Sequence, residues 1–200
     1  MPVEIEAKLK VESLEAVRER LHAAGAVFVR DVTERNLQYD SADGRLRQGD
    51  SVLRVRSLEV HRGAALPATL TYKGPRLPGR VKHRTEIELA IADAESAARL
   101  LESLGYVRLC LLEKRRETWQ LESCHVELDE LPYLGSFVEI EGPDEVSIAR
   151  VQQRLGLADR PHIPQGYIAL LYQHCQTHGL PFAEITFARA AQHTDPRYSV

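Results

Sequence analysis

Apolar and charged residues alternate along several stretches of the chain, with the two-residue period of a half-buried strand. The first of these stretches runs from Val3 to Lys10. Further strands are predicted over residues 26–40, 51–58, 68–73, 85–91, 106–121, 125–131 and 137–142. The pattern therefore predicts about eight strands, separated by turn-rich segments.

Apolar residues at helical spacing follow three of these strands. Ser13 and Asp93 are suitable N-caps for the first two helices, which Gly25 and Gly105 end. A third helix follows the last strand, and a final apolar helix covers residues 167–174. The tripeptide Glu-Ile-Glu occurs three times, each time in a strand that leads into a helix. The first two strand–helix units resemble each other closely in spacing, which indicates an internal duplication.

Charged residues of both signs share one face of these strands, while the other face is apolar. An antiparallel sheet of about eight strands can close into a barrel and so remove its edges. We therefore expect an α+β fold, a closed eight-stranded antiparallel β-barrel with its charges inside and helices packed outside. The apolar residues expected to face outward, under the helices, include Val3, Ile5, Leu70, Ile87, Leu89, Phe137 and Ile140.

Length and composition favour a single domain of residues 1–178 with a tail of residues 179–200. The chain has 200 residues, of which 44% are hydrophobic, so it is long enough to bury a core. The tail has no clear apolar period, and we expect it to be loosely ordered or to pack as a single extended arm. A net charge of -3 argues against a sequence-independent nucleic-acid coat.

The location predicted from the sequence is the cytoplasm. The three cysteines have neither Cys-x-x-Cys spacing nor an even number, so a disulfide framework is not indicated. No signal peptide precedes the first strand, and no apolar run is long enough to span a membrane. We expect no nucleic-acid or membrane partner, and a homodimer is left open.

The charges on the inward strand faces suggest a binding site. Burying so many ions would be costly without partners, which favours function over stability as their reason. Carboxylates without nearby His or Cys favour Mg²⁺ or Mn²⁺ over zinc. Basic side chains on the same faces suit a triphosphate, because Arg makes paired contacts to oxygens and Lys acts as a point charge.

Six sequence elements, in consistent order, resemble the CYTH, or triphosphate tunnel metalloenzyme, superfamily. They are Glu4-x-Glu6-x-Lys8, Arg54-x-Arg56, residues 70–75, Lys82-x-Arg84-x-Glu86-x-Glu88, Lys114-x-Arg116 and residues 128–141. The closest similarity is to the class IV adenylyl cyclase branch. The resemblance covers about residues 3–175 and implies an eight-stranded tunnel that binds a nucleoside or inorganic triphosphate with a divalent metal.

The resemblance also implies roles for the charged residues. The metal, Mg²⁺ or Mn²⁺, is expected at Glu4, Glu6, Glu139 and Glu141. The phosphates are expected at Arg54, Arg56, Lys73, Lys82, Arg84, Lys114 and Arg116. The residues expected to act in catalysis are Lys8, Glu86, Glu88 and Asp129. Lys8 also belongs to the bases that clamp the phosphates, and the three acids are expected near the reacting oxygen or a second metal.

Several activities are compatible with such a site. Adenylyl cyclase, which converts ATP to cyclic AMP and pyrophosphate, is ranked first. The alternative is a triphosphatase that hydrolyses thiamine triphosphate, tripolyphosphate or a nucleoside triphosphate. Two features depart from the cyclase pattern: no His-Phe pair precedes Glu4, and Gly166-Tyr167 replaces the Ser-Tyr that commonly opens the C-terminal helix. A non-catalytic binder of polyphosphate or nucleotide would not need three acidic pairs. In a structural barrel whose charges merely pair, the cost of burying those charges would go uncompensated.

Overall fold

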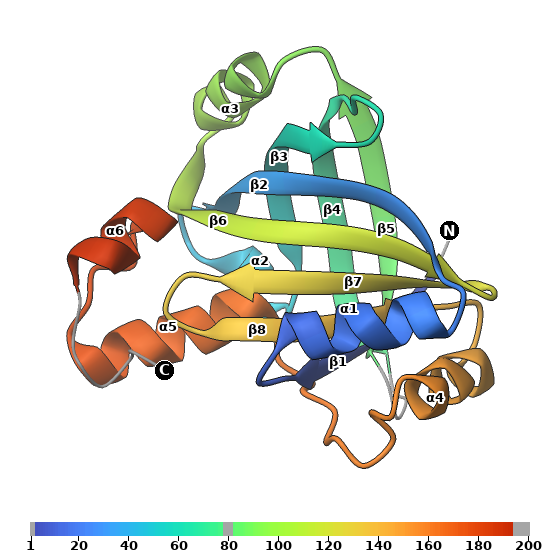
Figure 1. Ribbon diagram of the computed structural model, residues 1–200. Helices are drawn as coiled ribbons and strands as arrows, with labels where there is room; N and C mark the ends of the chain where they lie inside the picture. The colour runs from blue at the N-terminus through green and yellow to red at the C-terminus, as the bar shows by residue number, and fades with distance from the viewer. Residues whose placement is uncertain (1–2, 78–81, 194–200) are drawn as a thin grey trace.

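The computed structural model describes residues 3–77 and 82–193, and of Val3 and Lys82 the backbone alone. Its main element is a closed barrel of eight antiparallel strands, as the sequence predicts (Figure 1). The strands are β1 (Val3–Lys10), β2 (Val27–Ser41), β3 (Val52–Arg62), β4 (Ala68–Leu77), β5 (Lys82–Ile91), β6 (Tyr106–Leu121), β7 (Cys124–Leu131) and β8 (Gly135–Glu141). They lie in the order β2-β3-β4-β5-β1-β8-β7-β6, and pairing of β2 with β6 closes the barrel.

Helices follow the strands where the apolar spacing predicts them. They are α1 (Leu14–Ala23), α3 (Ala94–Ser103), α4 (Glu145–Arg154) and α5 (Tyr167–His178), with a four-residue helix α2 (Arg45–Gln48) that the sequence did not indicate. Ser13 caps α1 by accepting a hydrogen bond from the Ala16 amide, and Asp93 caps α3 in the same way. Such caps satisfy amides that lack a partner inside the helix.

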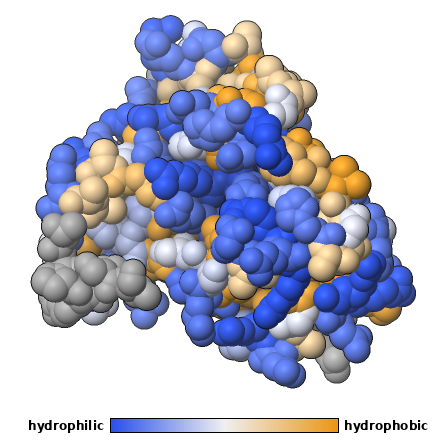
Figure 2. All heavy atoms as spheres, viewed as in Figure 1, coloured by the Kyte–Doolittle hydropathy of each residue, from blue (hydrophilic) through white to orange (hydrophobic). Residues whose placement is uncertain are grey.

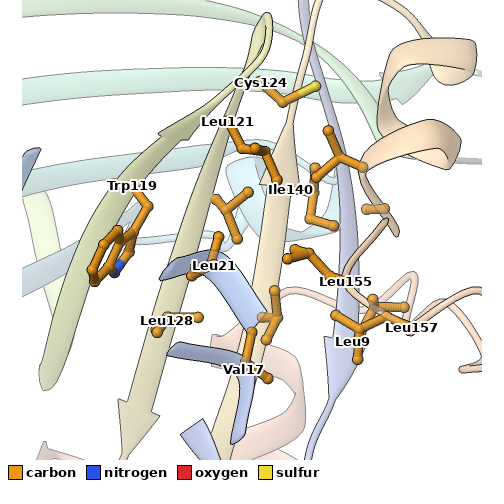
Figure 3. Packing of buried hydrophobic residues seen from close by; sticks show 14 of the residues in the cluster. Leu9, Val17, Leu21, Trp119, Leu121, Cys124, Leu128, Ile140, Leu155 and Leu157 are labelled. Atoms are coloured by element: carbon orange, nitrogen blue, oxygen red, sulfur yellow. The ribbon is translucent and has the colours of Figure 1, made fainter. Parts of the chain in front are cut away.

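The main hydrophobic core lies between the outer face of the barrel and the helices α1 and α4 (Figure 3). Leu128 of β7 and Ile140 of β8 meet Leu21 of α1 and Leu155 at the end of α4, all of them buried. A smaller cluster under α3 includes Tyr39. The alternating apolar face of the strands therefore packs against helices, and this packing leaves the charged face to the interior.

The helices do not cover all of the outer face. Ile87 and Leu89 of β5 are 45% and 55% exposed, so the expectation that helices cover them is wrong. Phe137 was also expected to face outward, but it shares the parity of Glu139 and packs against Tyr167 of α5, with ring centroids 5.2 Å apart. The reason is positional: α5 covers one end of the barrel, so an inward residue near that end becomes part of an apolar cluster.

The described part of the tail is folded. Strand β9 (Glu184–Ile185) pairs in parallel with β6, outside the closed barrel, and is followed by α6 (Phe187–Gln192). Ile185 is fully buried in the cluster formed with α5. The expectation of a loose or single extended arm is therefore wrong for residues 179–193, because Ile185 anchors the segment. The division of the chain at residue 178 stays a prediction.

Among the described residues, no helix has the length and apolar character needed to cross a membrane. Hydrophilic residues make up most of the face shown in Figure 2, with apolar residues in smaller groups.

Candidate functional site

The inward faces of the strands enclose a cavity of about 360 Å³. The side chains that line it are mostly charged. Among the described residues, its acids are Glu4, Glu6, Glu34, Glu86, Glu88, Glu127, Glu139 and Glu141, and its bases are Lys8, Arg30, Arg54, Arg56, Lys73, Lys114 and Arg116. Acids and bases are thus nearly balanced in number, and the cavity is not simply a basic pocket.

Arg116 of β6 is the centre of the largest ion-pair network. Its Nε and Nη2 atoms donate to Oδ1 and Oδ2 of Asp129 at 2.6 and 2.5 Å, and Nη2 also donates to Oε2 of Glu139 at 2.5 Å. Its Nη1 atom pairs with Glu127. Burial opposes the charged form, but Asp129 and Glu127 raise the pKa of Arg116 well above its ordinary value. The guanidinium therefore stays charged.

Lys8 of β1 connects this network to the start of α5. Its Nζ atom lies 3.2 Å from Oε1 of Glu139 and donates to the carbonyl oxygen of Gln165 at 3.1 Å. The same atom lies 3.6 Å from the ring centroid of Tyr167, a cation–π distance. The Tyr167 hydroxyl in turn donates to Oδ2 of Asp129 at 2.8 Å. Glu139, Asp129 and α5 thus fix the position of the Lys8 ammonium.

Glu34 of β2 holds two further bases. Its Oε1 atom lies 3.2 Å from Nη1 of Arg56, and its Oε2 atom lies 3.3 Å from Nζ of Lys114. Asn36 accepts a hydrogen bond from Nε of Arg56 at 2.9 Å. Burial would raise the pKa of Glu34, but Arg56 and Lys114 lower it well below its ordinary value. Glu34 is therefore ionised and orients both cations.

A second group lies where β1, β4 and β5 meet. Nζ of Lys73 donates to both carboxylate oxygens of Glu4, at 2.8 and 2.6 Å, and lies 3.2 Å from Oε2 of Glu86. Glu6 is paired in register with Glu141 across β1 and β8. Carboxylates from three strands therefore face one another here, with Lys73 among them.

Comparison with known proteins identifies the family. The sequence profile of the CYTH domain matches residues 2–167. The chain belongs to the CYTH family.

Relatives of this CYTH protein carry cyclase names. A Methanocaldococcus jannaschii protein provisionally named an adenylate cyclase is 29% identical over 139 residues, which are 70% of this chain and 76% of that protein. The adenylate cyclase CyaB of Aeromonas hydrophila is 28% identical over 76% of each chain. Enzymes of the family act on small triphosphates and generally need a metal.

Solved structures show the same fold. The PH1819 protein of Pyrococcus horikoshii has a TM-score of 0.73 at 26% identity, covering 86% of this chain and 99% of that one. A Hippeastrum protein, described as a provisional adenylyl cyclase with a dominant triphosphatase activity, has a TM-score of 0.66 at 19% identity, covering 86% and 96%. At that identity the second likeness shows the fold alone.

The carboxylates around Glu141 fit a divalent cation in their chemistry. Burial, together with the like charges of Glu4 and Glu6, raises the pKa of Glu141 to about 7. A cation would relieve this repulsion, and oxygen ligands of this kind suit Mg²⁺ or Mn²⁺. In the part of the chain that the structure describes, however, no three His, Cys, Asp or Glu side chains converge as a metal site.

Two other groups in the cavity have shifted pKa values. Burial raises the pKa of Glu127 to about 7, although the contact with Arg116 opposes this. Burial, followed by the like charge of Arg56, lowers the pKa of Arg54 to about 10. Arg54 donates through Nη2 only to the neutral Thr71 hydroxyl, at 3.4 Å. It is therefore a base in the cavity that lacks a carboxylate in direct contact, among the residues that the structure describes.

Most of the site residues predicted from the sequence line this cavity. Asp129 does not, because it is fully buried behind Arg116. Arg84 does not either: its guanidinium donates to Oδ1 of Asp50 at 2.8 Å and to the carbonyl oxygen of Gly74 at 3.2 Å. The side chain of Lys82 lies outside the described residues. The roles assigned to all of these residues stay predictions.

Strand β2 and helix α5 also contribute to the cavity, which the sequence pattern did not indicate. Glu34, Asn36, Gln38 and Arg30 line the cavity from β2, and Tyr167 lines it from α5. Polar residues occupy both faces of β2, for example Glu34 and Arg35, so alternation alone does not reveal which face is inward. Placing Asn36 opposite Arg56, which is expected to face inward, would have shown which face of β2 is inward. The strand register confirms this pairing.

Proposed function

We propose that the barrel binds a linear triphosphate together with divalent cations and acts at its phosphate bonds, with ATP cyclisation ranked first. The observation that carries this proposal is the near balance of acids and bases around one cavity. Within the part of the chain that is described, every base in the cavity except Arg54 and Arg30 is already in contact with a carboxylate. A polyanion without cations would have to compete with these carboxylates. Cations that bind the carboxylates would release the bases for phosphate.

The proposed phosphate ligands are the bases that converge on the cavity. Arg54, Arg56 and Arg116 offer paired contacts to phosphate oxygens, and Lys8, Lys73 and Lys114 act as point charges. The strands place these bases around one cavity, so once cations have released them they can stabilise the charge that develops on a leaving pyrophosphate or phosphoryl group. Preorganised charges of this kind are usually the largest contribution to catalysis.

The proposed cation ligands are Glu4, Glu6, Glu139 and Glu141. Bound Mg²⁺ or Mn²⁺ would neutralise phosphate oxygens and polarise the bond that breaks. Glu139 now pairs with Lys8 and Arg116, so it would exchange these partners as the phosphate takes over the two bases. Glu86 and Glu88 line the same cavity and are proposed near the reacting oxygen.

Glu127 is the proposed proton acceptor. Its carboxyl lines the cavity, and a pKa of about 7 is close to the value at which a general base works best near neutral pH. In a cyclase it would take the proton of the ribose 3′-hydroxyl as that oxygen attacks the α-phosphorus. In a triphosphatase it would take a proton from water. The geometry of the clamp serves both reactions.

The second candidate function is therefore triphosphate hydrolysis. It is supported by the fold shared with the Hippeastrum protein and by the departures from the cyclase pattern before Glu4 and at Gly166.

Product identity separates the two functions. The purified chain would be incubated with Mg²⁺ or Mn²⁺ and ATP, thiamine triphosphate or tripolyphosphate. Cyclic AMP with pyrophosphate from ATP is the expected result, whereas orthophosphate without cyclic AMP would make the protein a triphosphatase. No product from any substrate would contradict both.

A further inference from the structure

Gln38 of β2 is a buried amide directed into the cavity that the phosphate chemistry leaves unused. It is only 7% exposed and lines the cavity. Across β2 it is paired with Arg54 of β3 and with Cys110 of β6. Among the described residues, no hydrogen bond involves its side-chain amide. Its amide atoms are not among the buried side-chain atoms that lack a hydrogen-bond partner. The amide is therefore open to the cavity, where a ligand can form hydrogen bonds with it.

Apolar residues line the cavity on neighbouring strands, beyond the directly paired Arg54. Val52 is two residues from Arg54 on β3, and Leu112 is two residues from Cys110 on β6, so both flank Gln38 on the inward face. Both line the cavity. Ile168 and Tyr167 of α5 line it as well and pack with the cluster that contains Leu112. The α5 end of the cavity therefore combines apolar and aromatic surface with one amide, next to the charged part.

We infer that this end of the cavity, with Gln38 at its centre, binds the heterocyclic base of the substrate. The inference rests on the proposed triphosphate function and names the part of the substrate that the charged residues do not contact. A flat ring fits against apolar and aromatic side chains. The amide group both donates and accepts, which matches an exocyclic amino group beside a ring nitrogen, as in adenine. The aminopyrimidine of thiamine shares this edge. Inorganic tripolyphosphate has nothing to place there.

The test compares ligands that differ only in this group. The full chain, its Gln38→Met variant and a control Gln173→Met variant would be titrated calorimetrically with a non-hydrolysable ATP analogue, thiamine triphosphate and tripolyphosphate, all with Mg²⁺. Methionine keeps the length of the side chain but removes the amide, and Gln173 is exposed on α5. Gln38→Met should weaken binding of the ATP analogue about tenfold or more, as expected for loss of a paired base contact. Its affinity for tripolyphosphate should change by no more than about twofold.

A second ligand tests the chemistry of the contact. A purine riboside triphosphate analogue lacks the exocyclic amino group, so the unaltered chain should bind it more weakly than the adenine analogue, and Gln38→Met should abolish that difference.

The inference is overturned if Gln38→Met leaves binding of the ATP analogue unaffected, or weakens binding of the ATP analogue and of tripolyphosphate equally. If thiamine triphosphate alone is affected, the base is an aminopyrimidine and the adenine assignment is wrong. If the unaltered chain binds tripolyphosphate and no triphosphate depends on Gln38, this inference fails while the proposed function stands. If the unaltered chain binds no triphosphate, the proposed function fails as well.

Discussion

The Tyr167 hydroxyl donates a hydrogen bond to Oδ2 of Asp129 at 2.8 Å, and this contact joins α5 to the interior of the barrel. Asp129 is fully buried and also receives two hydrogen bonds from Arg116. Burial and the charge of Asp129 raise the pKa of Tyr167 well above its ordinary value, so the phenol remains a neutral donor. The helix that covers one end of the cavity is thereby coupled to the centre of the charge network.

Tyr167→Phe should therefore destabilise the fold moderately. The substitution keeps the ring beside Lys8 but removes one hydrogen bond to a charged group, a loss of about 1.5–3 kcal/mol. Chemical denaturation would measure the free energy of unfolding. Tyr172→Phe is the matched control, because Tyr172 is on the same helix and 49% exposed. Equal effects of the two substitutions would show that the contact with Asp129 adds nothing.

Arg116→Ala should be much more destabilising than removal of a surface arginine. It leaves Asp129 and two glutamates buried without their main cation, and breaking such a buried ion pair costs about 3–5 kcal/mol. The control is Arg35→Ala, since Arg35 is 53% exposed and pairs with Glu113. A surface pair of that kind contributes about 0–1 kcal/mol. If the two variants had similar denaturation midpoints, the network around Arg116 would not be a major element of stability.

The raised pKa of Glu127 predicts a pH dependence of stability. Its pKa is about 7 in the folded protein and about 4.3 in an unfolded chain. Between these values the folded state binds more protons, so the free energy of unfolding should fall as pH rises. In chelator-treated protein, Glu127→Gln should make this fall smaller. Glu130→Gln, at a residue whose side chain is 43% exposed, should leave the slope unchanged. The same slope in all three proteins would contradict the assignment.

The position of Glu34 predicts a gain of binding on its removal. Glu34→Gln takes away the carboxylate that holds Arg56 and Lys114, so both bases become more available to phosphate. Tripolyphosphate should bind the variant a few-fold more tightly than the unaltered chain when divalent cations are absent. Glu113→Gln is the control, since Glu113 pairs with Arg35 and is not among the residues that line the cavity. Weaker binding by the Glu34 variant would mean that Glu34 supports the clamp rather than competes with it.

Much of the fold follows from the sequence because alternation is strong where one strand face is apolar. The strand predicted over residues 106–121 has those ends in the structure, and the barrel closure follows from the number of strands. The exposure of Ile87 and Leu89 could not be predicted, since it depends on where each connecting helix lies. Burial of Ile185 in the tail likewise depends on contacts with α5, which is distant from β6 in sequence but adjacent in space.

The candidate site was predictable where acids and bases alternate, and less so elsewhere. Lys8 and Arg116 line the cavity as their parity requires. Arg84 has inward parity too, but its guanidinium donates to Asp50, which lies in the turn before β3. Parity on one strand does not predict such a partner from a loop. The amide of Gln38 carries no charge, so no charge pattern could indicate it.

The most direct test of the central claim is calorimetric titration of tripolyphosphate into the full chain, once with Mg²⁺ and once with all divalent cations removed. The claim is that the carboxylates of the cavity occupy the bases until cations release them. Binding should therefore be at least about tenfold tighter with Mg²⁺ than without it. Glu6→Gln, which removes a proposed cation ligand, should reduce this difference. Equal affinity with and without Mg²⁺, or no binding in either condition, would contradict the account.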